Sequence, residues 1–131
     1  MTSIRSIKEV CLYVKDLDQT ELFYRDQLGF EVISKKNDRH IFFRVGDQVL
    51  LCFIPEVTKA DTKLPPHYAS GPQHIAFEVS KQDYKPMLEK LLAQGVPIIH
   101  EEHWRGDLYS AYFKDPDDHV LEIVVEGLWD Y

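Results

Sequence analysis

One histidine and two glutamates in this chain carry side chains that bind metal ions. His74 begins the apolar run HIAFEV, Glu9 begins the run EVCLYV, and Glu122 lies inside the run VLEIVV. A neutral imidazole and two carboxylates suit a divalent ion such as Mn, Fe, Co, Ni or Zn. Three protein ligands leave coordination positions open to water and substrate, which is typical of a catalytic metal. The question is whether the fold brings the three residues together.

The order of elements occurs twice in the chain. Each half reads as a strand, a helix and three further strands, separated by polar turns. The expected strands lie at residues 10–14, 30–34, 40–45 and 49–55 of the first half, and at 74–79, 97–103, 108–114 and 120–125 of the second. The repeat aligns Glu9 with His74 and Leu51 with Glu122.

Each half also contains one expected helix with recognisable ends. In the first half a helix should begin at Asp18, which stands three residues before Glu21 as a capping box requires, and should end at Gly29. In the second half Pro86 would clash within a helix that ran unbroken from residue 80. We therefore expect an irregular first turn or a helix that begins nearer Asp83.

The repeat gives the three residues a common location. Side chains alternate across a strand, so equivalent positions at the strand ends can share one face. If two modules curl around one concave sheet surface, Glu9, Leu51, His74 and Glu122 converge. Two buried carboxylates would repel each other without a cation. We expect an α+β fold of two tandem βαβββ modules, forming a cupped mixed sheet around a central site that holds Glu9, His74 and Glu122 as metal ligands.

The length and composition of the chain limit its possible domain organisation and binding partners. The 131 residues predict a single domain, with module one at about 5–55, a linker at about 56–71 and module two at about 72–126. Lys and Arg number 15 against 22 Asp and Glu, a net charge of -7 without a basic cluster. This excludes a nucleic-acid or anionic-membrane surface and leaves a small molecule or a like subunit as partner. No signal peptide or membrane-length apolar run occurs, so we expect a cytoplasmic protein.

Other polar and aromatic residues are candidates for contact with a substrate. Ser110 and Tyr112 share a strand face and could reach a substrate oxygen. Cys11 shares the face of Glu9, so it either lines the site or is a buried, inert thiol. The segment HEEH at 100–103 cannot converge as a unit, because neighbouring residues on a strand point to opposite faces, and we expect it to be exposed. The two tryptophans, Trp104 and Trp129, would cover the site or a dimer contact.

Four motifs resemble those of the vicinal oxygen chelate superfamily. They are YVKDL at 13–17, FY followed by LGF at 23–30, GPQHIAFEV at 71–79 and YFKDPDDHVLE at 112–122. The resemblance covers the chain from about residue 7 to 125. It implies two βαβββ modules around a metal, usually in a homodimer, and it places the family's metal ligands on Glu9, His74 and Glu122.

The superfamily contains several reaction types. Glyoxalase I has a four-ligand site with a glutamate base, and Leu51 occupies one of those four positions here. Extradiol dioxygenases and fosfomycin thiol transferases have histidine where this chain has Glu9, although the transferases share the pattern Ser-x-Tyr-Phe that begins at Ser110. Bleomycin-resistance proteins bind without catalysis and without the metal triad. The resemblance also extends to methylmalonyl-CoA epimerase.

We interpret the chain as a glyoxalase-like divalent-metal enzyme of the lyase or isomerase type. Its expected substrate is a small molecule whose two neighbouring oxygens chelate the ion. The ion would stabilise a developing oxyanion while Glu122 or Glu9 carries the proton. The alternatives are a metal-independent protein that sequesters a small molecule such as an antibiotic, a fosfomycin-type thiol transferase, and an extradiol dioxygenase.

Overall fold

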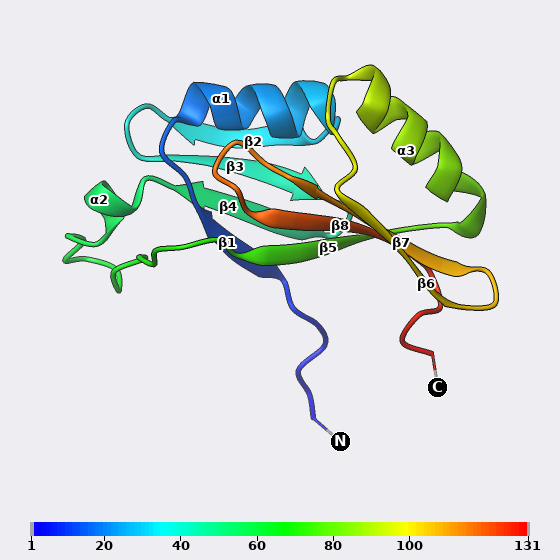
Figure 1. Ribbon diagram of the computed structural model, residues 1–131. Helices are drawn as coiled ribbons and strands as arrows, with labels where there is room; N and C mark the ends of the chain where they lie inside the picture. Colours follow the sequence, from blue (N-terminus) through cyan, green and yellow to red (C-terminus); the bar gives the residue numbers. More distant parts are fainter. Residues whose placement is uncertain (1, 131) are drawn as a thin grey trace. The chain divides into compact units, whose positions relative to one another are not determined.

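The computed structural model describes residues 2–130 of the chain. The chain divides into two compact units, the first ending at Gly71 and the second beginning at Pro72. Each unit contains its own four-stranded mixed sheet together with helices (Figure 1). The predicted α+β class with two tandem βαβββ modules is therefore confirmed. None of the helices within residues 2–130 is long and apolar enough to cross a bilayer.

The first unit has the strand order β1-β4-β3-β2, with β1 parallel to β4 and the other pairs antiparallel. Its core lies between this sheet and the helical segment α1 and η1, where Tyr24 packs on Phe43 with ring centroids 5.4 Å apart. The elements are β1 (Glu9–Tyr13), α1 (Leu17–Glu21), the π-helix η1 (Leu22–Gln27), β2 (Glu31–Lys36), β3 (His40–Val45), β4 (Gln48–Phe53) and α2 (Pro55–Thr58).

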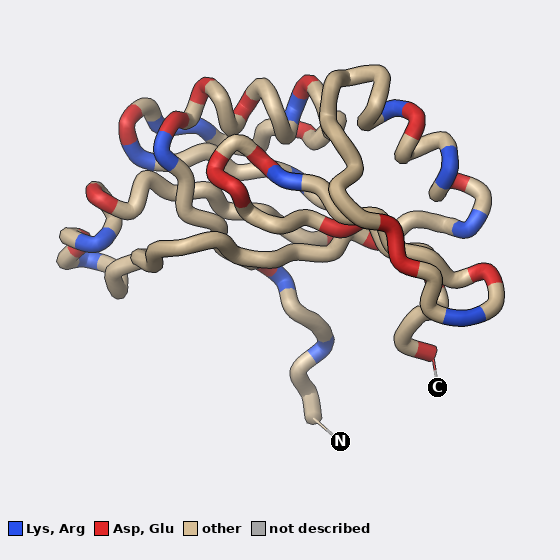
Figure 2. The backbone as a smooth tube through the Cα atoms, in the orientation of Figure 1, with Lys and Arg blue, Asp and Glu red and all other residues tan. Residues whose placement is uncertain are grey.

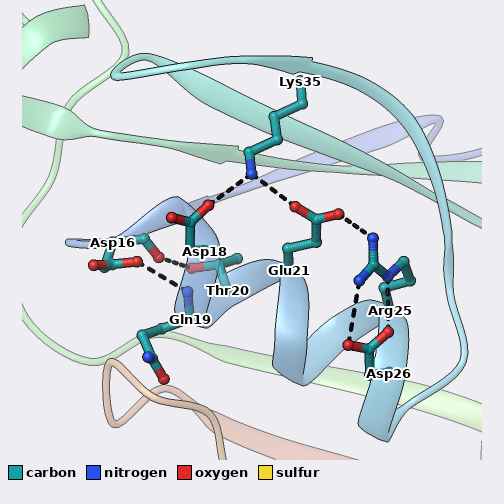
Figure 3. Close-up of polar contacts among 8 residues, drawn as sticks. All are labelled: Asp16, Asp18, Gln19, Thr20, Glu21, Arg25, Asp26 and Lys35. Carbon is teal, nitrogen blue, oxygen red and sulfur yellow. Dashed lines mark hydrogen bonds and ion pairs between the residues drawn. The ribbon is translucent and has the colours of Figure 1, made fainter.

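Helix α1 begins earlier than the sequence predicted. Asp16, not Asp18, is the N-cap, and its Oδ1 accepts a hydrogen bond from the backbone N–H of Gln19 at 2.9 Å. The predicted capping box is wrong because both of its carboxylates bind another partner. The Nζ atom of Lys35 donates to Asp18 at 2.8 Å and to Glu21 at 2.7 Å (Figure 3). This ion-paired group ties the start of α1 to β2.

The ends of the neighbouring elements follow from glycine and proline. Gly29 has a φ of 89°, which confirms the predicted left-handed stop after the first helical segment. Strand β4 ends at Phe53 instead of Pro55, because Pro55 occupies the first turn of the short helix α2. The predicted linker therefore begins with a helical turn.

The second unit repeats the arrangement of the first, with strand order β5-β8-β7-β6 and β5 parallel to β8. The 3-10 turn before α3 confirms the predicted irregular start, and it places Pro86 in the first turn of α3, where no backbone N–H is needed. The elements are β5 (His74–Val79), the 3-10 turn η2 (Lys81–Asp83), α3 (Tyr84–Ala93), β6 (His100–Arg105), β7 (Leu108–Lys114) and β8 (Val120–Val125).

The two sheets share one register, which confirms the repeat at the level of single residues. In both sheets the first strand pairs with the last strand, and the last strand with the third. The pairs are Glu9 with Val49, Cys11 with Leu51 and Leu51 with Phe42 in the first sheet, and His74 with Val120, Ala76 with Glu122 and Glu122 with Tyr112 in the second. Glu9 thus corresponds to His74, and Leu51 to Glu122.

Candidate functional site

The second unit gathers its polar side chains on one face of its sheet. Leu121 and Ile123 of β8 are buried in the core of this unit. Because side chains alternate along a strand, Glu122 points to the opposite face. His74 on β5 and Tyr112 on β7 lie on the two strands that flank β8. Three neighbouring strands therefore present an imidazole, a carboxylate and a phenol together.

His74 is held in one tautomer. Its Nδ1 atom lies 2.8 Å from the carbonyl oxygen of Val120, and a carbonyl oxygen only accepts hydrogen bonds, so Nδ1 carries the hydrogen. The other ring nitrogen, Nε2, lies 3.2 Å from Oε1 of Glu122. In a neutral imidazole this nitrogen has a lone pair. Two acceptor atoms face each other, and such a pair attracts a shared hydrogen or a cation.

Glu122 is buried, with 6% of its surface exposed. Its second oxygen, Oε2, accepts a hydrogen bond of 2.5 Å from the hydroxyl of Ser110. Ser110 is fully buried and accepts in turn from Nε1 of Trp104 at 2.9 Å. The carboxylate is therefore oriented by a chain of hydrogen bonds behind it. Hydrogen bonds of this kind are typical of carboxylates that bind metal ions.

Tyr112 lies between two histidine rings. Its ring centroid is 6.3 Å from that of His74 and 5.8 Å from that of His100. Burial and the negative charge of Glu122 raise the pKa of Tyr112 above its ordinary value. The phenol therefore keeps its proton at neutral pH and can donate a hydrogen bond to an oxygen atom.

A cavity of about 280 Å³ opens beside these residues, within the second unit. His74, Tyr112 and Glu122 contribute polar groups to its lining. Another part of its wall consists of Trp104, Trp129 and Arg105. The cavity thus combines a small set of polar groups with an apolar wall, as small-molecule sites do.

The start of β5 is fastened to the turn that precedes β8. Nδ1 of His119 accepts a hydrogen bond from the backbone N–H of Gln73 at 2.9 Å, and the backbone N–H of His119 donates to Asp115 at 2.9 Å. His119 is 2% exposed. Since Gln73 precedes His74, this buried contact fixes the strand end from which His74 projects.

The remaining predicted site residues lie in the first unit. Glu9 is exposed at the start of β1, and Cys11 is half-buried two residues later, on the same face. Burial and the charge of Glu9 raise the pKa of Cys11, so it is a thiol at neutral pH. Across residues 2–130, no three His, Cys, Asp or Glu side chains form a group that could hold a metal ion. His74 and Glu122 are paired; the ligand triad with Glu9 stays a prediction.

The sequence placed Trp104 of β6 near the site or a dimer contact, but it did not identify its neighbour Arg105 as a residue of the site. As strand alternation predicts, the segment 100–103 splits: His100 lies 3.3 Å from Glu102, whereas His103 stacks on Tyr109 at 4.5 Å between ring centroids. The consecutive residues Trp104 and Arg105 both line the cavity. Strict alternation forbids this, but the register of β6 on β7 shifts between His103 and Arg105. No residue pattern in the sequence signals that bulge.

Basic and acidic residues are interspersed along the chain. Figure 2 shows Lys and Arg positions scattered among acidic ones instead of gathered on one segment. Such mixing gives no basic stripe of the kind that follows a phosphate backbone.

Comparisons with known proteins agree with the fold and the repeat. Glutathione transferase FosA of Serratia marcescens is 30% identical over 125 residues, which are 95% of this chain and 84% of the relative. Metallothiol transferase FosB of Lysinibacillus sphaericus is 27% identical over 98% of this chain and 87% of its own length. The crystal structure of lactoylglutathione lyase from Agrobacterium tumefaciens is similar with a TM-score of 0.93 and 33% identity, covering 99% of this chain and all of that one.

The family model with the description Glyoxalase/Bleomycin resistance protein/Dioxygenase superfamily matches residues 6–123. The match includes both modules, and it confirms the resemblance seen in the motifs. The chain belongs to the Glyoxalase/Bleomycin resistance protein/Dioxygenase superfamily.

Proposed function

We propose that this protein is a glyoxalase-like enzyme that uses a divalent metal ion to move a proton within a small substrate carrying two neighbouring oxygens. The reaction would be of the lyase or isomerase type. One observation carries the proposal: His74 Nε2 and Glu122 Oε1 face each other at 3.2 Å, with Nδ1 of the histidine already engaged by Val120. Nitrogen and carboxylate donors in this arrangement suit a divalent ion.

The proposed ligands are His74, Glu122 and Glu9. Glu9 belongs to the first unit. In this proposal the Glu9 that completes the site comes either from the same chain or from the second chain of a homodimer. Imidazole nitrogen and carboxylate oxygen suit Mn, Fe, Co, Ni and Zn. When bound, such an ion polarises a substrate oxygen and stabilises negative charge that develops on it.

The chain's own residues supply proton transfer and orientation. Glu122, or Glu9 in its place, accepts the proton from the substrate carbon and returns it to the neighbouring carbon. Tyr112 donates a hydrogen bond to a substrate oxygen, because its raised pKa keeps the phenol protonated. Ser110 keeps Glu122 in place, because its buried hydroxyl accepts from Trp104 and donates to Glu122, and we propose that the thiol of Cys11 faces the substrate. The likeness to a lactoylglutathione lyase supports this reaction class.

The decisive experiment is elemental analysis of protein purified without chelator, followed by calorimetric titration with Mn, Ni, Zn and Fe(II). We expect about one ion per chain for the wild type, and a loss of affinity of about 100-fold in His74→Ala and Glu122→Ala. His103→Ala and Glu89→Ala are matched controls, since both residues are exposed and neither lines the cavity. A protein that stays metal-free under saturating ions contradicts the proposal.

Glu9 needs a separate test because it lies in the other unit. Glu9→Gln keeps the size of the side chain and removes its charge. If Glu9 is a ligand, metal affinity falls by about tenfold or more while the free energy of unfolding of the metal-free protein stays unchanged. Unchanged metal affinity in Glu9→Gln would limit the ligand set to His74 and Glu122.

Thiol transfer to an antibiotic is the second candidate. It is favoured by the 30% identity to a glutathione transferase over 95% of the chain. The discriminating experiment expresses the protein in a sensitive host and compares growth on fosfomycin, together with a direct assay for a glutathione adduct. Resistance to fosfomycin that depends on added thiol and on His74 would support thiol transfer. Failure of the expressed protein to increase resistance would reject it.

The proposal also includes a cytoplasmic homodimer. Light scattering over a range of protein concentrations measures the mass directly. A mass of one chain at all concentrations would reject the dimer and restrict the site to a single chain.

A further inference from the structure

Two tryptophans border the cavity that contains His74 and Glu122. Trp104 is 45% exposed and Trp129 is 77% exposed, yet both line the same 280 Å³ space. Trp104 comes from β6, and Trp129 from the turn that follows β8 (Figure 1). Large aromatic side chains are costly to leave in water. Exposed apolar surface beside polar groups is typical of ligand-binding clefts.

The indole of Trp104 and the turn that carries Trp129 are each held by a hydrogen bond. Nε1 of Trp104 donates to Ser110 at 2.9 Å. The turn that carries Trp129 contains Gly127 with a φ of 97° and is bound by Arg105, whose Nη2 donates to the carbonyl oxygen of Leu128 at 2.8 Å. An aromatic wall fixed in this way loses little conformational entropy when a ligand binds.

We propose that this wall is a subsite for a planar aromatic ring, and therefore that the substrate is a monocyclic aromatic compound with its two neighbouring oxygens attached beside the ring. The position of the oxygens rests on the proposed function, whereas the ring subsite does not. The ring would lie against Trp104 and Trp129, and the oxygens would reach His74 and Glu122.

The size of the cavity favours one ring. Sites for drug-sized ligands measure roughly 300–1,000 Å³, so a cavity of about 280 Å³ is at the small end of that range. It is large enough for a six-membered ring with a short oxygenated substituent. The apolar residues Ala76, Val124 and Leu128 complete the lining around the indoles.

The chemistry of the wall favours a flat ring over a saturated one. Aromatic rings gain from stacked or edge-to-face contacts in addition to the area that they bury. Arg105 also lines the cavity, and planar guanidinium groups attract the faces of aromatic rings. A saturated ring of the same size gains none of these contacts.

The test compares two alcohols in chelator-treated protein. Benzyl alcohol and cyclohexylmethanol have the same carbon skeleton and one hydroxyl, but only the first is planar. Generic apolar binding favours cyclohexylmethanol, which is more hydrophobic. We expect the opposite order of affinities. A titration followed by nuclear magnetic resonance should show that benzyl alcohol binds about tenfold more tightly, a difference of about 1.4 kcal/mol in binding free energy.

Variants of Trp129 locate the preference. Trp129→Phe keeps an aromatic face and should keep the preference for benzyl alcohol. Trp129→Leu keeps an apolar side chain and should lose most of it. A preference that survives in Trp129→Leu, or cyclohexylmethanol binding as tightly as benzyl alcohol to the wild type, overturns the subsite. The subsite is also overturned if Trp129→Leu halves the mass of the protein in solution and leaves the preference for benzyl alcohol unchanged. Trp129 would then contact a second copy of the chain.

A second pair of probes separates the subsite from the proposed function. Mandelate and hexahydromandelate carry identical hydroxyl and carboxylate oxygens beside an aromatic or a saturated ring. In metal-loaded protein we expect mandelate to bind about tenfold more tightly. Equal binding of both compounds overturns the subsite and leaves the metal site intact. Failure to bind metal, with the preference among the alcohols retained, contradicts the proposed function and supports the ring subsite.

Discussion

The indole N–H of Trp104 donates to the hydroxyl of Ser110 at 2.9 Å, and this contact sets the direction of the hydrogen bond between Ser110 and Glu122. An indole nitrogen is a donor only. The hydroxyl therefore accepts from Trp104 and turns its own hydrogen to Glu122, at 2.5 Å. The orientation of the buried carboxylate depends on these two side chains.

Ser110→Ala should weaken both the fold and metal binding. The substitution leaves Oε2 of buried Glu122 without its hydroxyl donor, and an unsatisfied buried polar group costs about 1–3 kcal/mol. We expect the free energy of unfolding in urea to fall by about 2 kcal/mol, and metal affinity by about tenfold. Ser3→Ala, at an exposed position, is the matched control. Equal stability of Ser110→Ala and wild type would show that the bond contributes nothing.

Asp16→Ala should destabilise the protein more than Asp18→Ala does. Asp16 caps α1 by accepting from the N–H of Gln19, and loss of a cap costs about 1 kcal/mol. Asp18 is 88% exposed in its side chain and binds only Lys35, so its removal should have a smaller effect. Thermal unfolding of both variants measures the difference. A larger effect of Asp18→Ala would restore the predicted capping box.

Tyr84→Phe should change how stability depends on alkaline pH. Burial and the hydrogen bond to Glu101, at 2.8 Å, raise the pKa of Tyr84 above its unfolded value of about 10. The folded state therefore favours the protonated phenol. Its contribution is fully present below pH 10 and is lost as the pH rises further.

Denaturant unfolding between pH 7 and 11 tests this. At pH 7 we expect the free energy of unfolding of Tyr84→Phe to be about 1 kcal/mol lower than that of the wild type. Above pH 10 this difference in free energy of unfolding should narrow. Tyr68→Phe, at an exposed tyrosine, should show neither effect. A gap that stays constant through pH 11 would mean that Tyr84 does not titrate differently in the folded state.

Leu51→Glu places a carboxylate at the position that corresponds to Glu122 in the repeat. Leu51 is 8% exposed, so the charge would be buried in the first unit. We expect the metal-free protein to lose about 2 kcal/mol or more of its free energy of unfolding. If the proposed metal is bound close to this position, saturating Mn should recover part of the loss. Leu51→Gln, which has the same size and no charge, should show no recovery with Mn.

The repeated order of strands and helices could be predicted from the sequence, because strand alternation and glycine stops are local rules. The equivalence of Glu9 with His74 and of Leu51 with Glu122 follows from the repeat, and the pairing of Cys11 with Leu51 and of Ala76 with Glu122 agrees with it. The location of His74 beside Glu122 was therefore predictable. Two residues aligned in a duplicated module lie in equivalent places, whatever the loops between them do.

The residues behind and around the site were not predictable in the same way. The bulge between His103 and Arg105 puts two consecutive side chains on the cavity, and no local pattern specifies it. The contact of Trp104 with Ser110 depends on that bulge. The choice of Asp16 over Asp18 as cap depended on Lys35, which is far along the chain and draws Asp18 away. Long-range contacts decided both cases.

The bond from Ser110 makes the two oxygens of Glu122 chemically unequal. One oxygen is bound by a hydroxyl, and only the other faces His74. In the proposed site, Oε1 of Glu122 would be the oxygen presented beside His74, while Oε2 stays engaged by Ser110. The carboxylate cannot exchange its two oxygens by rotation without breaking the bond from Ser110, so the oxygen that a ligand in the cavity meets is fixed before the ligand binds.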